Sequence, residues 1–224
     1  MKINLKLAVA AATITLATSA QAQTMCVFDL LGANGESYSM MKDYALAAKQ
    51  WGADVKLKAY TDERVASEDF KAGQCDGVAL TGIRARQFNH FVGSIDAVGG
   101  LTSNTGAKTI IGLMANPKLA ADMVSGAYEV VGVTTLGSAY VMVNDRAINT
   151  LAKAAGKRFG VLDYDKAQAI IVQKQGAQPV SVDLLTIGGK FNNGQVDIIA
   201  LPAMAFKPLE LHKGIGSKGA IIRF

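Results

Sequence analysis

The hydrophobic pattern after residue 22 alternates between short apolar runs and stretches with helical spacing. In the first half, apolar runs bounded by turn residues predict strands at residues 25–31, 55–60 and 78–80. Apolar residues three and four positions apart predict helices at residues 36–51 and 63–72, and a glycine follows each of them. This alternation is typical of α/β folds with parallel sheets.

The second half repeats the order of the first. Apolar runs predict strands at residues 158–162, 179–182 and 196–201, and helical spacing predicts helices at residues 165–175 and 184–192. The region between the halves is less regular. There the pattern predicts strands at residues 109–114, 129–134 and 138–143 and a helix at residues 117–125.

One short segment occurs in both halves. Residues 70–80 and 191–201 share Phe, Gly, Gln, Asp and Leu at the same offsets. Each segment is a helix ended by a glycine, followed by an aspartate and a buried strand. We interpret the pair as one α/β unit repeated in two lobes. The alternative is coincidence, because glycine-capped helix-to-strand turns are common.

The Gly-x-x-Asp unit resembles the periplasmic solute-binding proteins, and more closely the receptors of TRAP-type transporters. The residues that carry this resemblance are 156–161, 176–179 and 194–197, and residues 128–132 with 137–140 resemble the family's crossing between lobes. The chain is also similar to a related group of solute-binding proteins, some labelled as components of RND-type efflux linked to aminoglycoside resistance. Nothing in the sequence supports an efflux pump directly.

The resemblance implies an α/β fold of two lobes, with mainly parallel sheets flanked by helices. Residues 23–137 would form lobe 1, residues 138–208 lobe 2, and residues 209–224 a crossover back toward lobe 1, with hinges near residues 137–140 and 202–215. Family members are longer, and this chain stops inside a predicted strand. We therefore expect the fold to be incomplete at its C-terminal end.

The N-terminus has the pattern of a cleaved export signal. Lys2 and Lys6 precede an apolar stretch, and the small residues before Gln23 predict cleavage after Ala22. A membrane anchor or a buried helix is the alternative. Removing residues 1–22 leaves 202 residues with 21 basic and 18 acidic side chains, a net charge of +3. The chain has no clustered basic face, which argues against nucleic-acid binding. Because of the export signal, we expect the protein in the periplasm.

Two cysteines in an exported chain favour one disulfide. Cys26 and Cys75 both lie at the start of predicted strands, which would be neighbours in one sheet. The alternative is two unpaired core residues.

Ligands bind beyond the carboxyl ends of strands in open α/β sheets, and this rule selects several loops. The loop before residue 36 would present helix N–H groups to a polar ligand, and the arginines after residue 80 would pair with a carboxylate or phosphate. Capping, solvation or burial in the core is the alternative for each residue. The candidates are Asn34, Glu36, Thr61, Asp62, Thr81, Arg84, Arg86, Tyr140, Arg158, Asp163 and Tyr164.

Arg158 belongs to this set through the resemblance. The arginine that clamps a substrate carboxylate in many such receptors falls on Gly160 here, and Arg158 would point to the same face of the strand. If Asp163 and Asp165 instead face the ligand, a cationic solute is expected.

The sequence gives little support for catalysis. His90 and His212 are the only histidines, neither lies at metal-ligand spacing, and no nucleophile motif appears. We therefore expect a receptor for a small polar solute that works as a monomer with integral-membrane transporter subunits and needs no cofactor or metal. The alternatives are a non-catalytic adaptor of an envelope efflux system and an exported enzyme on the same fold.

Overall fold

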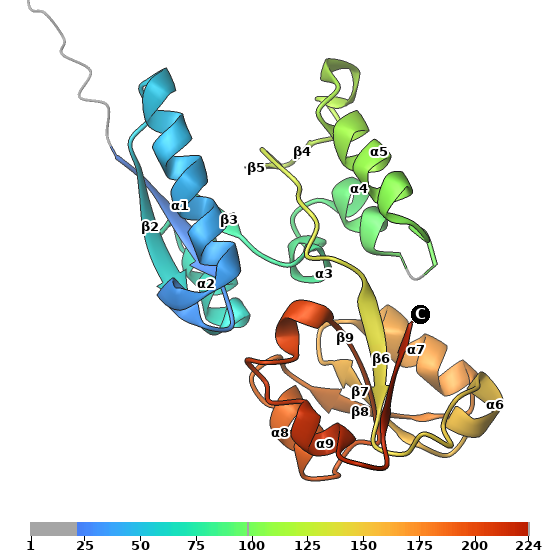
Figure 1. The fold of residues 1–224 in the computed structure, drawn as a ribbon. Coiled ribbons are helices and arrows are strands. Elements are labelled where there is room, and N and C mark those ends of the chain that lie inside the picture. The colour runs from blue at the N-terminus through green and yellow to red at the C-terminus, as the bar shows by residue number, and fades with distance from the viewer. Residues whose placement is uncertain (1–21, 98, 224) are drawn as a thin grey trace, which may run out of the picture.

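The computed structural model describes residues 22–97 and 99–223, so the predicted export signal lies outside it except for Ala22. The chain forms two lobes (Figure 1). In lobe 1, β1 (Gln23–Phe28) lies between β2 (Val55–Tyr60) and β3 (Gly77–Ala79), and all three strands are parallel.

Two helices cover opposite faces of this sheet. The first is α1 (Glu36–Ala48), extended by a 3-10 turn, η2 (Lys49–Trp51), and the second is α2 (Glu63–Lys71). Because side chains alternate along a strand, Leu57 faces α1 while Lys58 bonds to Asp69 of α2. The predicted disulfide is present: Cys26 of β1 is joined to Cys75, and both are buried.

The region between residues 80 and 130 differs most from the predictions. It contains the short helices α3 (Gly82–Ala85) and α4 (His90–Gly93), the 3-10 turns η3 (Ser94–Asp96) and η4 (Pro117–Leu119), the helix α5 (Asn104–Met114), and a small hairpin of β4 (Val124–Ser125) with β5 (Tyr128–Glu129).

Three predictions for this region are wrong. Residues 109–114 belong to α5, because the side chain of Ser103 accepts the Gly106 amide and starts a helix that the β-branched residues then continue. The helix predicted at residues 117–125 ends after one 3-10 turn. The strand predicted at residues 129–134 is limited to the hairpin pair of β5.

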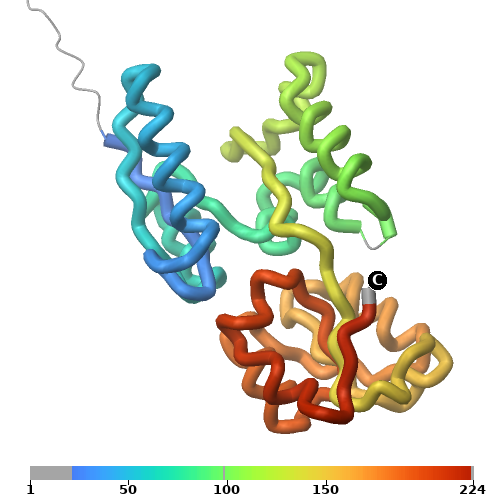
Figure 2. Tube along the Cα trace, viewed as in Figure 1, coloured from blue at the N-terminus to red at the C-terminus, as the bar shows by residue number. Residues whose placement is uncertain are grey.

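An aromatic cluster attaches the hairpin to α2. Phe88 lies 5.4 Å from Phe70 and 4.8 Å from Tyr128, measured between ring centroids, in edge-to-face arrangements. Such pairs add to the energy of apolar burial. After the hairpin, the chain crosses to lobe 2 without regular structure and enters β6 (Ala139–Val143), as the yellow part of the tube shows (Figure 2).

Lobe 2 is a mixed sheet in the order β10-β6-β9-β7-β8. Strands β7, β8 and β9 are parallel, β6 is antiparallel to β9, and β10 is antiparallel to β6. The elements after β6 are α6 (Leu151–Ala154), β7 (Arg158–Leu162), α7 (Lys166–Lys174), β8 (Gln178–Val182), α8 (Ile187–Asn192), β9 (Ile198–Pro202), the 3-10 turn η5 (Ala203–Ala205), α9 (His212–Ile215) and β10 (Ala220–Arg223).

The last segment of the chain differs from its predicted course. Residues 209–224 were expected to cross back toward lobe 1, with a hinge at residues 202–215. Instead, Leu211 is buried beside Phe191 in the core of lobe 2, and β10 pairs with β6 along its free edge. Burial of these apolar side chains and the ladder of hydrogen bonds keep the described part of this segment in lobe 2.

The repeated unit of the sequence has the same geometry in both lobes. Gly73 and Gly194 both end a helix at positive φ, at 72° and 67°. The carboxylate of Asp76 then accepts the Thr24 amide at 2.7 Å, and that of Asp197 accepts the Arg158 amide at 2.9 Å. The aspartate in each copy therefore ties its strand to the neighbouring strand of the same lobe.

None of the helices in residues 22–97 and 99–223 has the length and apolarity that a membrane span requires.

Candidate functional site

The candidate site lies where the carboxyl ends of the lobe 1 strands meet the loop after β7. Its central residue is Glu63, the first residue of α2, which the neighbouring cap positions. Asp62 turns its side chain back to accept the Arg64 amide at 2.8 Å, and Glu63 points inward with only 2% of its surface exposed.

Glu63 joins the two lobes. Its Oε1 accepts the Thr81 amide at 2.7 Å within lobe 1, and its Oε2 accepts the hydroxyl of Tyr164 from lobe 2 at 2.9 Å. Burial raises the pKa of the Glu63 carboxyl, while these hydrogen bonds and the nearby Arg84 act in the opposite direction. Burial and the Glu63 carboxylate raise the pKa of Tyr164, so the phenol remains a hydrogen-bond donor.

Arg84 lies over the ring of Tyr164. The guanidinium carbon is 3.5 Å from the ring centroid, a close cation–π contact, and Nε is 3.5 Å from Glu63 Oε2. Within residues 22–97 and 99–223, the guanidinium makes no hydrogen bond, and its buried Nε has no partner. Thr81 positions the start of α3 by accepting the Arg84 amide at 3.3 Å.

A second ion pair crosses between the lobes beside the first contact. Arg86 Nη1 lies 3.6 Å from Asp165 Oδ1, and Asp165 also caps α7 by accepting the Gln168 amide. Asp96 lies against Gly82, where a Cβ atom would come within 1.8 Å of its carboxylate. Burial raises the pKa of Asp96, and Asp165 adds to this while Arg86 opposes it.

The structure thus brings four of the predicted residues together: Thr81, Arg84, Arg86 and Tyr164. The predicted set lacked Glu63 and Asp96. The sequence did contain a signal for Glu63, because it directly follows the strong N-cap Asp62. An acidic residue at that position is either solvated in the first helical turn or turned toward the protein interior. For Asp96 the irregular sequence around it gave no signal.

Other predicted residues lie outside this cluster. Asn34 is exposed on the loop before α1, and Glu36 is exposed as the first residue of α1. Buried Asp29 holds this segment by accepting two amides, those of Leu31 and Tyr38. The remaining residues have these places: Thr61 is exposed, Asp62 caps α2, Tyr140 packs on the core of lobe 2, and Asp163 is exposed after β7.

Arg158 does not belong to this cluster, which corrects the interpretation of it as a carboxylate clamp. It lies at the amino end of β7 and pairs with Asp197 through two side-chain contacts, Nη2 to Oδ1 at 2.7 Å and Nε to Oδ2 at 3.0 Å. A side chain at Gly160 would point into the core, since its Cβ would lie 3.2 Å from Ile199. Lobe 2 therefore offers no arginine at either position.

The Arg158–Asp197 pair gives a pH prediction. Arg158, with Asn144, lowers the pKa of Asp197 to about 2. Because the unfolded carboxyl titrates near 4, the pair's stability is complete above about pH 5 and is lost as the pH falls from about 4 to 2. Water screens the half-exposed arginine, so we expect the free energy of unfolding to exceed that of Asp197→Asn by only about 1 kcal/mol at pH 6. Urea unfolding at pH 6 and pH 3 should show that difference narrowing, and a constant difference would contradict the assignment.

The part of the chain that the structure describes contains no group of three or more His, Cys, Asp or Glu side chains suited to a metal ion. The chemistry available at the site is that of hydrogen bonding and ion pairing: two guanidiniums, one phenol and three carboxylates around the boundary between the lobes.

Comparison with known sequences identifies related proteins. The family model of solute-binding protein AdeT 1/2 matches residues 45–224. The Probable solute-binding protein AdeT1 of Acinetobacter baumannii is 56% identical over 198 residues, which are 88% of this chain and 65% of that protein. The Probable solute-binding protein AdeT2 of the same organism is 30% identical over 133 residues, 59% of this chain and 56% of that protein. The matches thus span less than two thirds of these relatives.

Solved structures share the fold at low sequence identity. A TRAP periplasmic solute-binding protein from Desulfovibrio salexigens with bound orotic acid has a TM-score of 0.69 at 16% identity, over 90% of this chain and 68% of that one. A Bordetella pertussis extracytoplasmic solute receptor binding pyroglutamic acid has a TM-score of 0.67 at 12% identity, over 89% and 68%. One from Xanthobacter autotrophicus with β-D-galacturonate reaches 0.69 at 12%, over 86% and 65%. The two-lobed α/β fold predicted from the sequence is therefore confirmed.

Proposed function

The chain belongs to the AdeT1/2 family of solute-binding proteins, and from this premise we propose that it captures a small organic acid between its two lobes and delivers it to a membrane transporter. Binding, not turnover, is its role. The export signal predicted at residues 1–22 would place this receptor in the periplasm, and it would act there as a monomer without a cofactor.

The observation that carries the proposal is the state of Arg84. Its guanidinium lies over the ring of Tyr164 and 3.5 Å from Glu63 Oε2, yet its buried Nε–H donates no hydrogen bond to a described residue. A guanidinium pairs with a carboxylate through two parallel hydrogen bonds, and a fixed orientation lowers the entropy cost of forming them. Arg84 is therefore a prepared anchor for an anionic group at the boundary between the lobes.

The neighbours of Arg84 define the rest of the solute. Glu63 is an acceptor beside it, Asp96 is an acceptor near Arg86, and the phenol of Tyr164 is both a donor and an apolar surface. A solute that carries a hydroxyl or amide beside its carboxylate would satisfy all of them. The ligands of the three structural neighbours, orotic acid, pyroglutamic acid and β-D-galacturonate, are of this kind. They support an organic acid here even though lobe 2 lacks an arginine clamp.

The contacts between the lobes supply the conformational part of the mechanism. Tyr164–Glu63 and Arg86–Asp165 join the two lobes. A solute that enters when these contacts part would replace them with its own, and the closed form would be favoured by the difference in free energy between the two sets. Residues 130–138, which have no regular structure, would absorb the motion.

Native mass spectrometry of the protein purified gently from the periplasm tests this function directly. We expect a small-molecule adduct that is lost on mild unfolding, and a thermal shift with a carboxylic acid from a panel of organic acids, amino acids, polyamines and aminoglycosides. Adducts or shifts confined to cationic compounds would overturn the carboxylate assignment. A mass without adduct and no shift across the panel would favour the adaptor function.

A further inference from the structure

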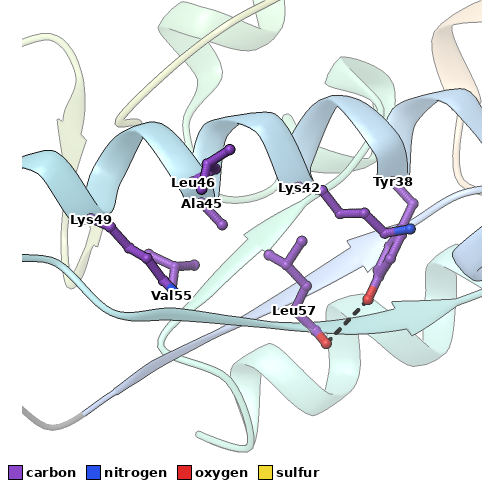
Figure 3. A pocket seen from close by; sticks show the side chains of 7 residues that line it. All are labelled: Tyr38, Lys42, Ala45, Leu46, Lys49, Val55 and Leu57. Atoms are coloured by element: carbon purple, nitrogen blue, oxygen red, sulfur yellow. Dashed lines mark hydrogen bonds between the residues drawn. The ribbon is translucent and has the colours of Figure 1, made fainter.

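A shallow groove runs along the outer side of lobe 1, away from the contact between the lobes. It has a volume of about 340 Å³ and lies between α1 and the edge strand β2 (Figure 3). Seven side chains line it: Tyr38, Lys42, Ala45, Leu46, Lys49, Val55 and Leu57. None of them takes part in the candidate solute site.

The floor of the groove is an unpaired strand edge. The amides of Gln23 and Asp29 in the β1 chain donate to the carbonyls of Asp54 and Tyr60, so the even-numbered residues of β2 face β1. Hydrogen-bonding direction alternates along a strand in a parallel ladder, and the odd-numbered residues therefore present their N–H and C=O groups outward. The hydroxyl of Tyr38 already reaches the Leu57 carbonyl on this side, at 3.3 Å (Figure 3).

The wall of the groove is basic. Lys42 and Lys49 form no ion pair with any residue of 22–97 or 99–223, and they lie two helical turns apart, about 10 Å along α1. The acidic residues of α1, Glu36 and Asp43, do not line the groove. Lys42 Nζ lies 5.1 Å from the centroid of the Tyr38 ring. An acidic occupant would therefore meet two cations that form no ion pair with a described residue.

Apolar surface is exposed between and beside these lysines. Leu46, on the groove, is 67% exposed, and Trp51, at the end of η2, is 89% exposed. Large aromatic residues are enriched in interfaces because they bury much surface at little entropy cost. An open strand edge, free lysines and exposed apolar residues together are the features of a site for strand addition.

We propose that this groove binds an acidic, extended segment of a partner protein, which pairs as an added strand with the outer edge of β2. Glutamates four residues apart on one face of such a segment lie about 13 Å apart, within reach of the flexible Lys42 and Lys49 side chains. An apolar residue between the two glutamates would contact Leu46. The N–H and C=O groups of Val55 and the N–H of Leu57 would form the new ladder.

A designed peptide tests the proposal. The probe is Thr-Glu-Thr-Leu-Thr-Glu-Thr with both ends blocked and a fluorescent label, titrated with the purified protein. We expect saturable binding that is lost when both glutamates become glutamine and when the backbone amides that face β2 are N-methylated. The second control removes the hydrogen bonds and places methyl groups at the pairing edge, while the side chains are unchanged. Absence of binding at millimolar protein, or equal binding of either control peptide, would overturn the proposal.

Matched protein variants locate the binding. Lys42→Glu with Lys49→Glu should weaken peptide binding about tenfold or more, since two attractive pairs become repulsive. Lys166→Glu with Lys174→Glu on α7 of lobe 2 is the charge-matched control and should leave binding unchanged. Val55→Pro removes one outward amide without touching the ladder to β1 and should also weaken it. Circular dichroism would check folding.

Binding to phosphatidylglycerol vesicles that Trp51→Ala abolishes, together with no binding to the peptide, would overturn the proposal in favour of a lipid surface.

Discussion

Replacing Cys26 and Cys75 together with alanine is expected to lower the free energy of unfolding by about 4 kcal/mol. The disulfide closes a loop with a sequence separation of 49 residues, and the constraint on the unfolded chain grows with loop length. Both residues are almost fully buried in lobe 1, so the substitution also removes some packing. The loss should appear as a lower denaturant midpoint in guanidinium unfolding.

Few other packing contacts in the sheet and α1 of lobe 1 would compensate for loss of the disulfide. Its sheet has three strands, and α1 buries one side chain, that of Ala45. A reductant should therefore lower the midpoint of the natural chain and leave that of the alanine variant unchanged. If a reductant left both unchanged, the two thiols would not be joined in the purified protein.

The sequence predicted the elements that local chemistry determines. The strands at residues 55–60 and 158–162 coincide with β2 and β7, and both Gly-x-x-Asp units form the same turn. Each is specified by a buried run and a glycine that few other residues could replace at positive φ. The disulfide followed from the export pattern together with the positions of the two cysteines, one in β1 and the other just before its neighbour β3.

Elements that depend on distant contacts were predicted less well. The run Thr109 to Met114 contains Ile110 and Ile111, which suit a strand, but the cap at Ser103 upstream starts a helix. The position of residues 209–223 depends on contacts with lobe 2. Leu211 is buried in its core and β10 pairs with β6, and the local sequence does not indicate either contact. Both errors come from using periodicity where tertiary packing decides the outcome.

The candidate site shows the same division. Arg84 and Arg86 are candidates because strand ends are where α/β proteins place ligands, and both lie at the boundary between the lobes; that they bind a ligand stays a prediction. The prediction that Arg158 binds a carboxylate ligand is wrong because Arg158 pairs with Asp197. Asp197 is far away in sequence, although the repeated unit places it beside β7. Glu63 was missed because its partner Tyr164 is 101 residues away, and no local pattern links them.

Arg84→Met is expected to weaken binding of the organic acid about one hundredfold, because two charge-assisted hydrogen bonds are lost. Methionine keeps much of the apolar length that packs on Tyr164. Arg84→Lys keeps the charge without the planar fork and should be intermediate. Arg64→Met, which removes an exposed arginine of α2, is the matched control. Isothermal titration with the tightest carboxylate of the panel measures all four proteins.

A structural role for Arg84 predicts a different result, because its charge also neutralises Glu63, which lies 3.5 Å from Nε. Glu63→Gln removes the need for neutralisation; its single amide oxygen can accept the Thr81 amide, and its NH2 group can donate to the Tyr164 oxygen. If Arg84 anchors the solute, Arg84→Met should still cost about one hundredfold in the Glu63→Gln background, because the lost hydrogen bonds are those to the solute. If Arg84 only balances a buried charge, the same substitution in that background should leave the affinity unchanged, and the anchor assignment would be wrong.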